Sequence, residues 1–270
     1  MSSGEALCTW GAGTIWRFWS GLLTCQRTQS RSAVVEPFSA SSPQAVVLLS
    51  GGIDSATCAA LAVRRGFQVH GLTVDYGQTH RVELEAASRI ARHLELAGHH
   101  FLKLDLRAIA RSALLGSEPI PKDRPAEARA GSIPPTYVPA RNTILLSLAL
   151  SLAESIGASD IFLGANVVDY SGYPDCRPEF LAAFEHLANL GTRAAVEGKC
   201  RFRVHAPLLF LTKGEIIRLG VACGLDYGLT VSCYDPTADG LSCGRCDSCQ
   251  IRKKGFAEAG VPDPTPYADT

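Results

Sequence analysis

The stretch Ala45-Val-Val-Leu-Leu-Ser-Gly-Gly-Ile-Asp-Ser55 decides the fold. Residues 46–49 are apolar and typical of a strand that is buried on both faces. The glycine pair 51–52 ends this strand, and an apolar helix is expected over 56–63. The start of such a helix leaves backbone N–H groups without partners, and these donors, together with the helix dipole, favour an anion such as phosphate. The sequence therefore predicts a phosphate-binding turn at 50–55.

This turn differs from two common nucleotide-binding motifs. No Lys follows the second glycine, as a P-loop requires, and the spacing G-x-G-x-x-G of dinucleotide sites is absent. Ser50 and Ser55 add hydroxyl donors, while Asp54 either orients the turn or helps to hold a Mg ion that bridges phosphates. The alternative is a tight turn with an aspartate helix cap and no ligand. After a buried strand, the turn resembles the pyrophosphate loop (PP-loop) of the ATP pyrophosphatase superfamily, whose enzymes cleave ATP to AMP and pyrophosphate.

Length, net charge and cysteine content limit the classes of protein to which this chain can belong. The 270 residues suffice for one large core or two small ones, and a formal net charge of +0 gives no electrostatic reason to expect nucleic acid or a membrane as partner. No apolar run reaches the ~18 residues that a membrane span needs. Four of the ten cysteines lie within 233–249, a grouping more typical of metal binding than of disulfides. We therefore expect a protein of the reducing cytoplasm.

Residues 1–42 differ in composition from the remainder. They hold all three tryptophans and only two acidic residues. Their arginines and serines are faintly similar to a transit peptide, but no hydrophobic core with a small-residue cleavage site indicates a secretory signal. We expect these residues to form a disordered extension, or to result from a translation start that was assigned too far upstream. A single domain is expected over 43–270.

From residue 45 onward, strand and helix patterns alternate, which predicts an α/β fold with a parallel sheet flanked by helices. The remaining strands are expected at 68–74, 99–104, 160–163 and 201–206, and the helices at 79–96, 143–156, 177–190 and 215–222. Residues 116–135 are expected to form a long loop or lid. Thr212 and Glu215 have the spacing of a capping box. The loops at 50–55, 75–80 and 164–176 all follow strands, so we expect them on the edge of the sheet where α/β proteins bind ligands.

The C-terminal cysteines have the spacing of a metal site. C-x-x-C-x-x-C places three thiols on one turn, and a fourth lies upstream: Cys233, Cys243, Cys246 and Cys249. Four thiolates leave no open coordination position, which indicates one structural zinc ion per chain. The alternatives are an iron–sulfur cluster or free thiols. His93-Leu94-Glu95 superficially completes the H-x-E…C-x-x-C pattern of zinc deaminases, but the separation is far too long.

Five blocks occur in a particular order over about residues 45–255: Ser50-Gly-Gly-Ile-Asp-Ser55, Asp75-Tyr-Gly-Gln78 with His80, Val138-Pro-Ala-Arg-Asn142, Ser171-Gly-Tyr-Pro-Asp-Cys-Arg177, and the four-cysteine block. Together they resemble the 7-cyano-7-deazaguanine synthase family of queuosine precursor synthesis. The block at 171–177 is the most specific to this family of the five. Ala140 departs from the pattern, because many relatives have glycine there. Residues 1–42 have no counterpart in the family.

The resemblance implies an adenine nucleotide alpha-hydrolase-like (PP-loop) fold, small-molecule substrates and a homodimer. The implied reaction converts 7-carboxy-7-deazaguanine and ammonia to 7-cyano-7-deazaguanine with ATP and Mg, through an adenylated carboxylate and then an adenylated amide. The implied ATP-binding residues are Leu49, Ser50, Gly51, Gly52, Ile53, Asp54, Ser55, Ala56, Thr57, Cys58 and Ala59.

Further site residues follow from the same blocks and from the chemistry. Catalysis is assigned to Asp54, Ser55, Arg141 and Lys213, and substrate binding to Tyr76, Gln78, Tyr173, Asp175 and Arg177. A carboxylate such as that of Asp175 suits a guanine-like edge, and an arginine suits the substrate carboxylate. Surface cations are the alternative for Lys213 and Arg141. His80 is either a hydrogen-bonding residue of its loop or a catalytic group.

Two other functions fit parts of the sequence. The first is another ATP pyrophosphatase of the same fold, such as a tRNA sulfur transferase or an amide-forming ligase. Sulfur transfer generally needs a cysteine pair or a persulfide carrier, for which Cys176 is the one candidate, and no basic stripe for RNA is present. The second is a non-catalytic, zinc-stabilised nucleotide-binding module, which would release no pyrophosphate.

Overall fold

The computed structural model describes residues 42–79, 82–125, 133–168 and 173–268. The chain divides into two units, Met1–Ala40 and Ser41–Thr270, and every described residue belongs to the second unit. The extension expected at 1–42 therefore lies, apart from Ser42, outside the described residues. Among the described helices, none has both the length and the apolar character needed to cross a membrane.

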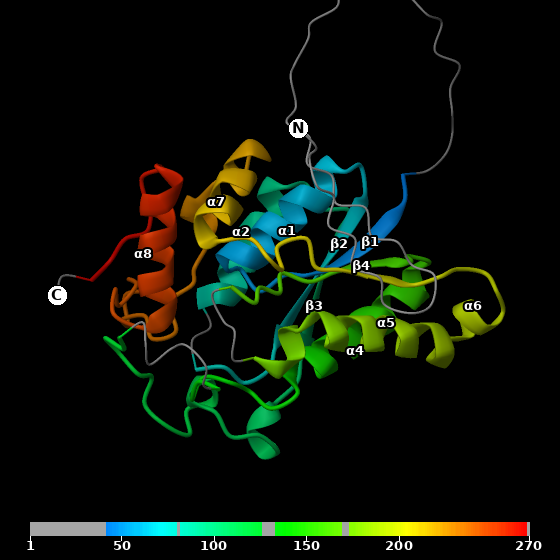
Figure 1. Ribbon diagram of the computed structural model, residues 1–270, viewed down its shortest axis with the longest axis horizontal. Coiled ribbons are helices and arrows are strands. Elements are labelled where there is room, and N and C mark those ends of the chain that lie inside the picture. Colours follow the sequence, from blue (N-terminus) through cyan, green and yellow to red (C-terminus); the bar gives the residue numbers. More distant parts are fainter. Residues whose placement is uncertain (1–41, 80–81, 126–132, 169–172, 269–270) are drawn as a thin grey trace, which may run out of the picture. The chain divides into compact units, whose positions relative to one another are not determined.

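Five parallel strands form one sheet in the order β3-β2-β1-β4-β5 (Figure 1). Their bounds are β1 (Gln44–Leu48), β2 (Gln68–Asp75), β3 (Gly98–Lys103), β4 (Asp160–Phe162) and β5 (Arg203–His205). The predicted α/β class with a parallel sheet is confirmed. The chain adds β2 and β3 on one side of β1 and then returns to add β4 and β5 on the other. Such a reversal opens a crevice at the carboxyl ends of the two strands beside it, which are here β1 and β4.

The helices that connect and flank the strands are α1 (Ile53–Arg64), α2 (Val82–His93), α4 (Arg141–Ile156), α5 (Pro178–Gly191), α6 (Arg193–Val196), α7 (Lys213–Ala222) and α8 (Asp247–Ala259). Short 3-10 turns lie at Leu106–Ala108, Ala113–Leu115, Pro174–Cys176 and Tyr227–Leu229. The sequence pattern did not predict α6, which is a single turn, or α8. The apolar period that identifies a helix is weak in α8, because its sequence is polar and contains a glycine.

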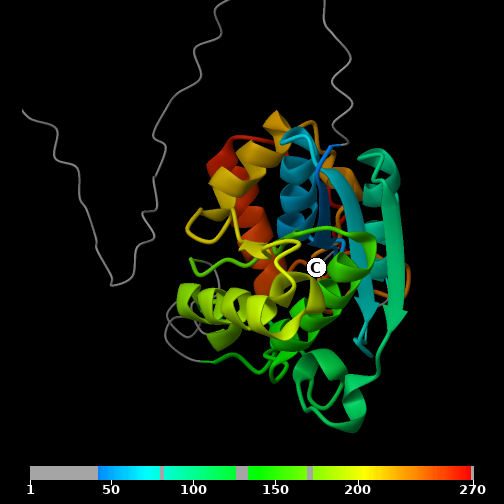
Figure 2. The same ribbon diagram turned by 90° about the vertical axis from the view of Figure 1, so that its right-hand side faces the viewer.

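The sheet is covered on both faces, and β1 lies between the two layers of helices. Ala45, Val47 and Leu49 pack into the core that contains residues of α1, α2, α7 and α8. Val46 and Leu48 face the opposite core, which contains residues of α4 and α5. Figure 1 shows α1, α2 and α7 on one side of the sheet and α4 and α5 on the other, and the turned view in Figure 2 agrees. The predicted burial of this strand on both faces is confirmed.

Two helix starts bear directly on the site. At α7, Thr212 Oγ1 accepts the N–H of Glu215 at 3.3 Å and Glu215 Oε2 accepts the N–H of Thr212 at 2.8 Å, so the predicted capping box is confirmed and places Lys213 at the first helical position. At α4, Ala140 precedes Arg141 with φ +53°, in the left-handed region. Glycine enters this region without steric cost, which gives a physical reason for the glycine expected at this position.

Candidate active site

The turn between β1 and α1 is closed by its own hydroxyl groups. Ser55 Oγ accepts the N–H of Ser50 at 3.2 Å, lies 3.0 Å from Ser50 Oγ, and donates to the carbonyl oxygen of Gly52 at 3.1 Å. Gly51 has φ +91°, and a Cβ built there would lie 2.2 Å from the carbonyl oxygen of Glu83. Only glycine fits at that position, since both the backbone conformation and the approach of α2 exclude a side chain.

The loop after β4 forms the second wall of the crevice. A Cβ on Gly164 would lie 2.9 Å from the backbone carbonyl carbon of Asp54, so this loop runs directly against the start of α1. Asn166 is buried and holds the loop in place, because its Nδ2 donates to the carbonyl oxygens of Leu208 at 2.9 Å and Leu211 at 2.7 Å. The turn is therefore enclosed by α2 on one side and by the β4 loop on the other.

A buried lysine meets the turn from α7. Lys213 Nζ donates to Asp54 Oδ1 at 2.5 Å, and only 6% of the Lys213 side chain and 22% of the Asp54 side chain are exposed. The stem of Lys213 passes over Gly255 of α8, where a Cβ would lie 2.3 Å from Lys213 Cγ. The alternative that Lys213 is a surface cation is therefore wrong. A cation and a carboxylate lie together beside the backbone donors of the turn.

A cavity of about 230 Å³ opens at the carboxyl ends of β1, β2 and β4. The structure brings to it most of the residues that the sequence assigned to ATP, catalysis and substrate: Leu49, Ser50, Gly52, Ile53, Asp54, Ser55, Tyr76, Gln78, Arg141, Tyr173 and Lys213. The other members of the 49–59 range do not line the cavity. They belong to the turn and to the face of α1 that packs against the core: Gly51, Ala56, Thr57, Cys58 and Ala59.

Tyr76 and Gln78 form the wall on the β2 side. Gln78 is buried, its Oε1 accepts the N–H of Tyr76 at 2.8 Å, and its Nε2 donates to Glu83 Oε1 at 2.8 Å. Burial raises the pKa of Tyr76 to about 12, which keeps its phenol protonated at neutral pH. The Arg141 guanidinium lies over the Tyr76 ring, 6.0 Å from its centroid. This wall presents an aromatic face, a fixed amide and a cation to the cavity.

The block that contains Tyr173 reaches the cavity only in part. Tyr173 is buried beside Thr136, with 3.0 Å between the two hydroxyl oxygens, and lines the cavity. Asp175 is also buried, but its Oδ2 accepts the N–H of Asn142 at 3.0 Å at the start of α4, and it is not among the lining residues. Arg177 is exposed and also lies outside the cavity wall. His80, Ser171 and Gly172 lie outside the described residues.

Cys176 lines the cavity as a neutral thiol. Its Sγ accepts a hydrogen bond from Asn142 Nδ2 at 3.3 Å. Burial raises the pKa of Cys176 to about 11, and the neighbouring Asp175 carboxylate adds to this shift. Cys58 is fully buried in the core, and burial raises its pKa to about 12. Neither thiol is activated as a nucleophile, because nucleophilic attack needs the thiolate.

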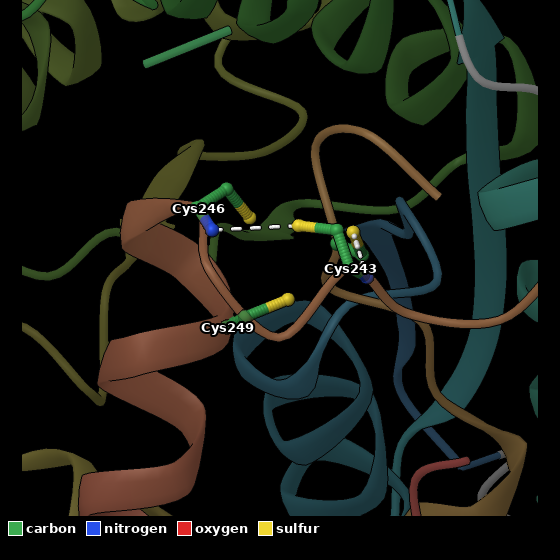
Figure 3. A group of neighbouring side chains, drawn as sticks. Cys243, Cys246 and Cys249 are labelled. Carbon is green, nitrogen blue, oxygen red and sulfur yellow. Dashed lines mark hydrogen bonds between the residues drawn. The ribbon is translucent and has the colours of Figure 1, made fainter. Parts of the chain in front are cut away.

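The four C-terminal cysteines come together at the start of α8. The Sγ atoms of Cys233, Cys243, Cys246 and Cys249 lie within 4.8 Å of one another, and all four residues are buried. Figure 3 shows the sulfur atoms of Cys243, Cys246 and Cys249 pointing into a common space. The thiols also accept backbone N–H groups, as in the contact from Cys246 N to Cys243 Sγ at 3.4 Å. Four sulfurs at about 2.3 Å from one ion lie within about 4 Å of each other, so these residues can hold a metal after small shifts.

The cavity also contains polar residues to which the sequence assigned no role: Glu83, Asn142, Asn166, Ser232, Tyr234, Ser248 and Arg252. Asn142 belongs to the block at 138–142, and Ser232 and Tyr234 flank Cys233 of the metal motif. These three residues could therefore have been found from their proximity to a motif in the sequence. Glu83 and Arg252 carried no such signal, because each reaches the cavity only through the packing of its helix.

Comparison with known proteins identifies the family of this chain. The family model described as Queuosine biosynthesis protein QueC matches residues 44–260. A protein of Syntrophobacter fumaroxidans named 7-cyano-7-deazaguanine synthase is 60% identical over 224 residues, which are 83% of this chain and 96% of that protein. One of Myxococcus xanthus with the same name is 58% identical over 84% of this chain and 98% of its own length. The NMN synthetase structure from Francisella tularensis aligns with 15% identity and a TM-score of 0.41 over 83% of this chain and 79% of that one. The chain belongs to the family of queuosine biosynthesis protein QueC.

Proposed function

We propose that this chain converts 7-carboxy-7-deazaguanine and ammonia to 7-cyano-7-deazaguanine at the expense of ATP. One observation carries the proposal beyond family membership. The phosphate turn, the cations Arg141 and Lys213 from distant helices, and the rings of Tyr76 and Tyr173 converge on a single cavity at the reversal point of the sheet. The relatives named 7-cyano-7-deazaguanine synthase match this chain over nearly their whole length, which supports the same activity here.

The chemistry explains why such a site needs phosphate binding. A carboxylate is a poor electrophile, so its oxygen first attacks the α-phosphorus of ATP and expels pyrophosphate, which leaves an acyl adenylate. Ammonia then attacks the acyl carbon, and AMP departs to leave the amide. The amide oxygen is adenylated by a second ATP, and loss of AMP and a proton gives the nitrile. These steps ask the protein mainly for positioning and for stabilisation of phosphate charge.

The turn and Lys213 are assigned to the phosphates. Ser50, Gly52 and Ser55 offer backbone and hydroxyl donors to the departing pyrophosphate, and Lys213 neutralises its charge. In the structure Lys213 pairs with Asp54 at 2.5 Å. We infer that phosphate binding draws the ammonium toward the phosphate and frees the Asp54 carboxylate. Asp54 is then the residue that would hold Mg, which when bound neutralises phosphate charge and orients the leaving group.

The opposite wall is assigned to the heterocyclic acid. Tyr76 and Tyr173 present aromatic surface, Gln78 presents an amide held by Glu83, and Arg141 supplies a cation for the substrate carboxylate. Asp175 contacts Asn142 rather than the cavity, which supports a positioning role at the start of α4. The exposed position of Arg177 offers no support for direct contact with substrate.

Zinc is the metal we propose for the cysteine site. Four thiolates form a closed donor set that suits a structural zinc ion, whereas an iron–sulfur cluster places several atoms among its thiolates and needs a wider arrangement. The described cysteines are all free, which supports a reducing cytoplasmic location. We also infer that the partners are small molecules rather than nucleic acid. A homodimer stays a prediction from the family resemblance.

The test is to incubate the full chain with 7-carboxy-7-deazaguanine, ammonium, ATP and Mg, and to measure product mass together with AMP. The expected product is the nitrile. The variants Asp54→Ala and Ser55→Ala should lose turnover while far-UV circular dichroism is unchanged. Ser147→Ala, on an exposed face of α4, is the matched control and should turn over normally. An amide as sole final product, or sulfur transfer in place of nitrile formation, would replace the proposed activity. No AMP with any substrate would favour the non-catalytic module.

A further inference from the structure

The segment that leads into the cysteine cluster also closes the phosphate turn. The N–H of Val231 donates to the carbonyl oxygen of Gly51 at 3.0 Å, and the N–H of Ile53 donates to Ser232 Oγ at 3.5 Å. The next residue along the chain, Cys233, is one of the four clustered cysteines. The turn and the cluster are therefore joined through two residues.

Ser232 is placed to contact whatever anion the turn holds. A Cβ built on Gly52 would lie 3.6 Å from Ser50 Oγ and 3.8 Å from Ser232 Oγ, so two hydroxyls flank this glycine. Ser232 lines the cavity together with Ser50, Ser55 and Lys213. Because Ser232 Oγ already accepts a hydrogen bond, its own O–H remains to be donated, and within the described part of the chain no acceptor takes it.

Both ends of this segment are anchored. At its start, the buried Arg252 of α8 donates to Thr230 Oγ1 at 2.8 Å and to the carbonyl oxygen of Tyr227 at 3.1 Å. At its end, Cys233 Sγ accepts the N–H groups of Cys243 at 3.2 Å and Asp235 at 3.3 Å. A metal ion that binds all four thiolates would fix Cys233, and with it the backbone position of its neighbour.

We propose that Ser232 is a further ligand of the departing diphosphate of ATP, and that occupation of the four-cysteine site holds it in position. The identity of the anion rests on the proposed function; the contacts between the segment and the turn do not. The metal site then contributes to nucleotide affinity as well as to folding. By linkage, nucleotide must tighten metal binding by the same factor.

The first experiment measures ATP affinity by calorimetry on the full-length, metal-loaded chain, without the carboxylate substrate or ammonia. Ser232→Ala should keep one metal ion per chain by elemental analysis and lose affinity by about tenfold or more, the usual effect of removing a hydrogen bond to a charged group. Ser232→Thr keeps the hydroxyl and should stay within about threefold. Ser242→Ala is the matched control, because Ser242 also precedes a clustered cysteine but does not line the cavity. Unchanged affinity in Ser232→Ala would overturn the proposal.

The second experiment tests the coupling in folded protein. Zinc release to a chromogenic chelator is timed with and without saturating Mg-ATP. ATP should slow release several-fold in the wild type and in Ser242→Ala, and the effect should vanish in Ser232→Ala. An ATP effect that is absent in the wild type, or that persists in Ser232→Ala, would show that the coupling does not run through this residue. Both readouts are independent of nitrile formation. A chain that fails to make the nitrile would therefore not contradict the role of Ser232, and a failure of the Ser232 experiments would not contradict nitrile formation.

Discussion

Replacing Gly255 with alanine should impair the active site without altering any residue in it. Gly255 lies in α8 beneath the stem of Lys213, and a Cβ there would lie 2.3 Å from Lys213 Cγ and 2.8 Å from Lys213 Cβ. Because Lys213 is buried and its ammonium is bound to Asp54, its stem has little freedom to retreat. The substitution therefore displaces a group assigned to phosphate charge.

The magnitude follows from the contact distance. Carbon atoms in normal contact lie about 3.5–4.0 Å apart, so the Lys213 stem must move by about 1 Å or more. A displacement of about 1 Å in a catalytic group costs on the order of 100-fold in rate. For stability, overpacking costs about 1–3 kcal/mol, while replacing glycine in a helix returns about 1 kcal/mol. The net loss is about 0–2 kcal/mol, which lowers the Tm by up to about 8 °C for a domain of this size.

The assay compares kcat/KM for ATP and the Tm of Gly255→Ala with those of Gly191→Ala. Gly191 ends α5, and a Cβ there meets no atom within 4 Å. This control should keep full activity and an equal or higher Tm. If Gly255→Ala also kept full activity and gained stability, Lys213 would not pass over α8 as described, and the reasoning would be refuted.

Three further predictions concern backbone strain, acid stability and thiol reactivity. Ala140→Gly should raise the free energy of unfolding by about 1 kcal/mol, because the left-handed conformation at φ +53° costs alanine more than glycine; a lower Tm in a thermal scan would contradict this. Burial is the largest single influence on the pKa of Asp160 and would raise it, but the hydrogen bonds from His205 at 2.7 Å and Ser159 at 2.8 Å, together with the charges of His205 and Arg203, hold this pKa below its usual value. This contribution to stability is present above the unfolded carboxyl pKa of about 3.9 and is lost as the pH falls through the folded value. The free energy of unfolding in urea should accordingly fall more steeply between pH 6 and pH 3 in the wild type than in Asp160→Asn. Equal slopes in the two proteins would exclude this contribution of Asp160. Burial raises the pKa of Cys176 to about 11, so iodoacetamide should alkylate this thiol slowly at pH 8 and faster with rising pH, as measured by peptide mass mapping; rapid labelling at pH 7 would favour the sulfur-carrier alternative.

The positions of the strands, their parallel sheet and the turn between β1 and α1 could be predicted from the sequence because they depend on local patterns. The apolar run before Ser50 predicted a buried strand, and the capping-box spacing at Thr212 predicted a helix after it, although α7 begins at Lys213, two residues before the expected start. Cysteine spacing likewise indicated a shared metal site, since three of the thiols lie on one turn. In each case the interacting residues are near each other in the chain, or the pattern reports burial directly.

Only the tertiary structure decided which distant side chains meet. Lys213 pairs with Asp54 across 159 residues, and Ser232 contacts the turn across 179 residues. Asp175 instead contacts the start of α4 and Arg177 faces solvent, although both belong to the block that was assigned to substrate binding. Periodicity and spacing show that a residue is buried, but not which segment packs against it. That choice depends on how helices from separate parts of the chain fill the space around one sheet edge, and it is settled only when the whole core packs.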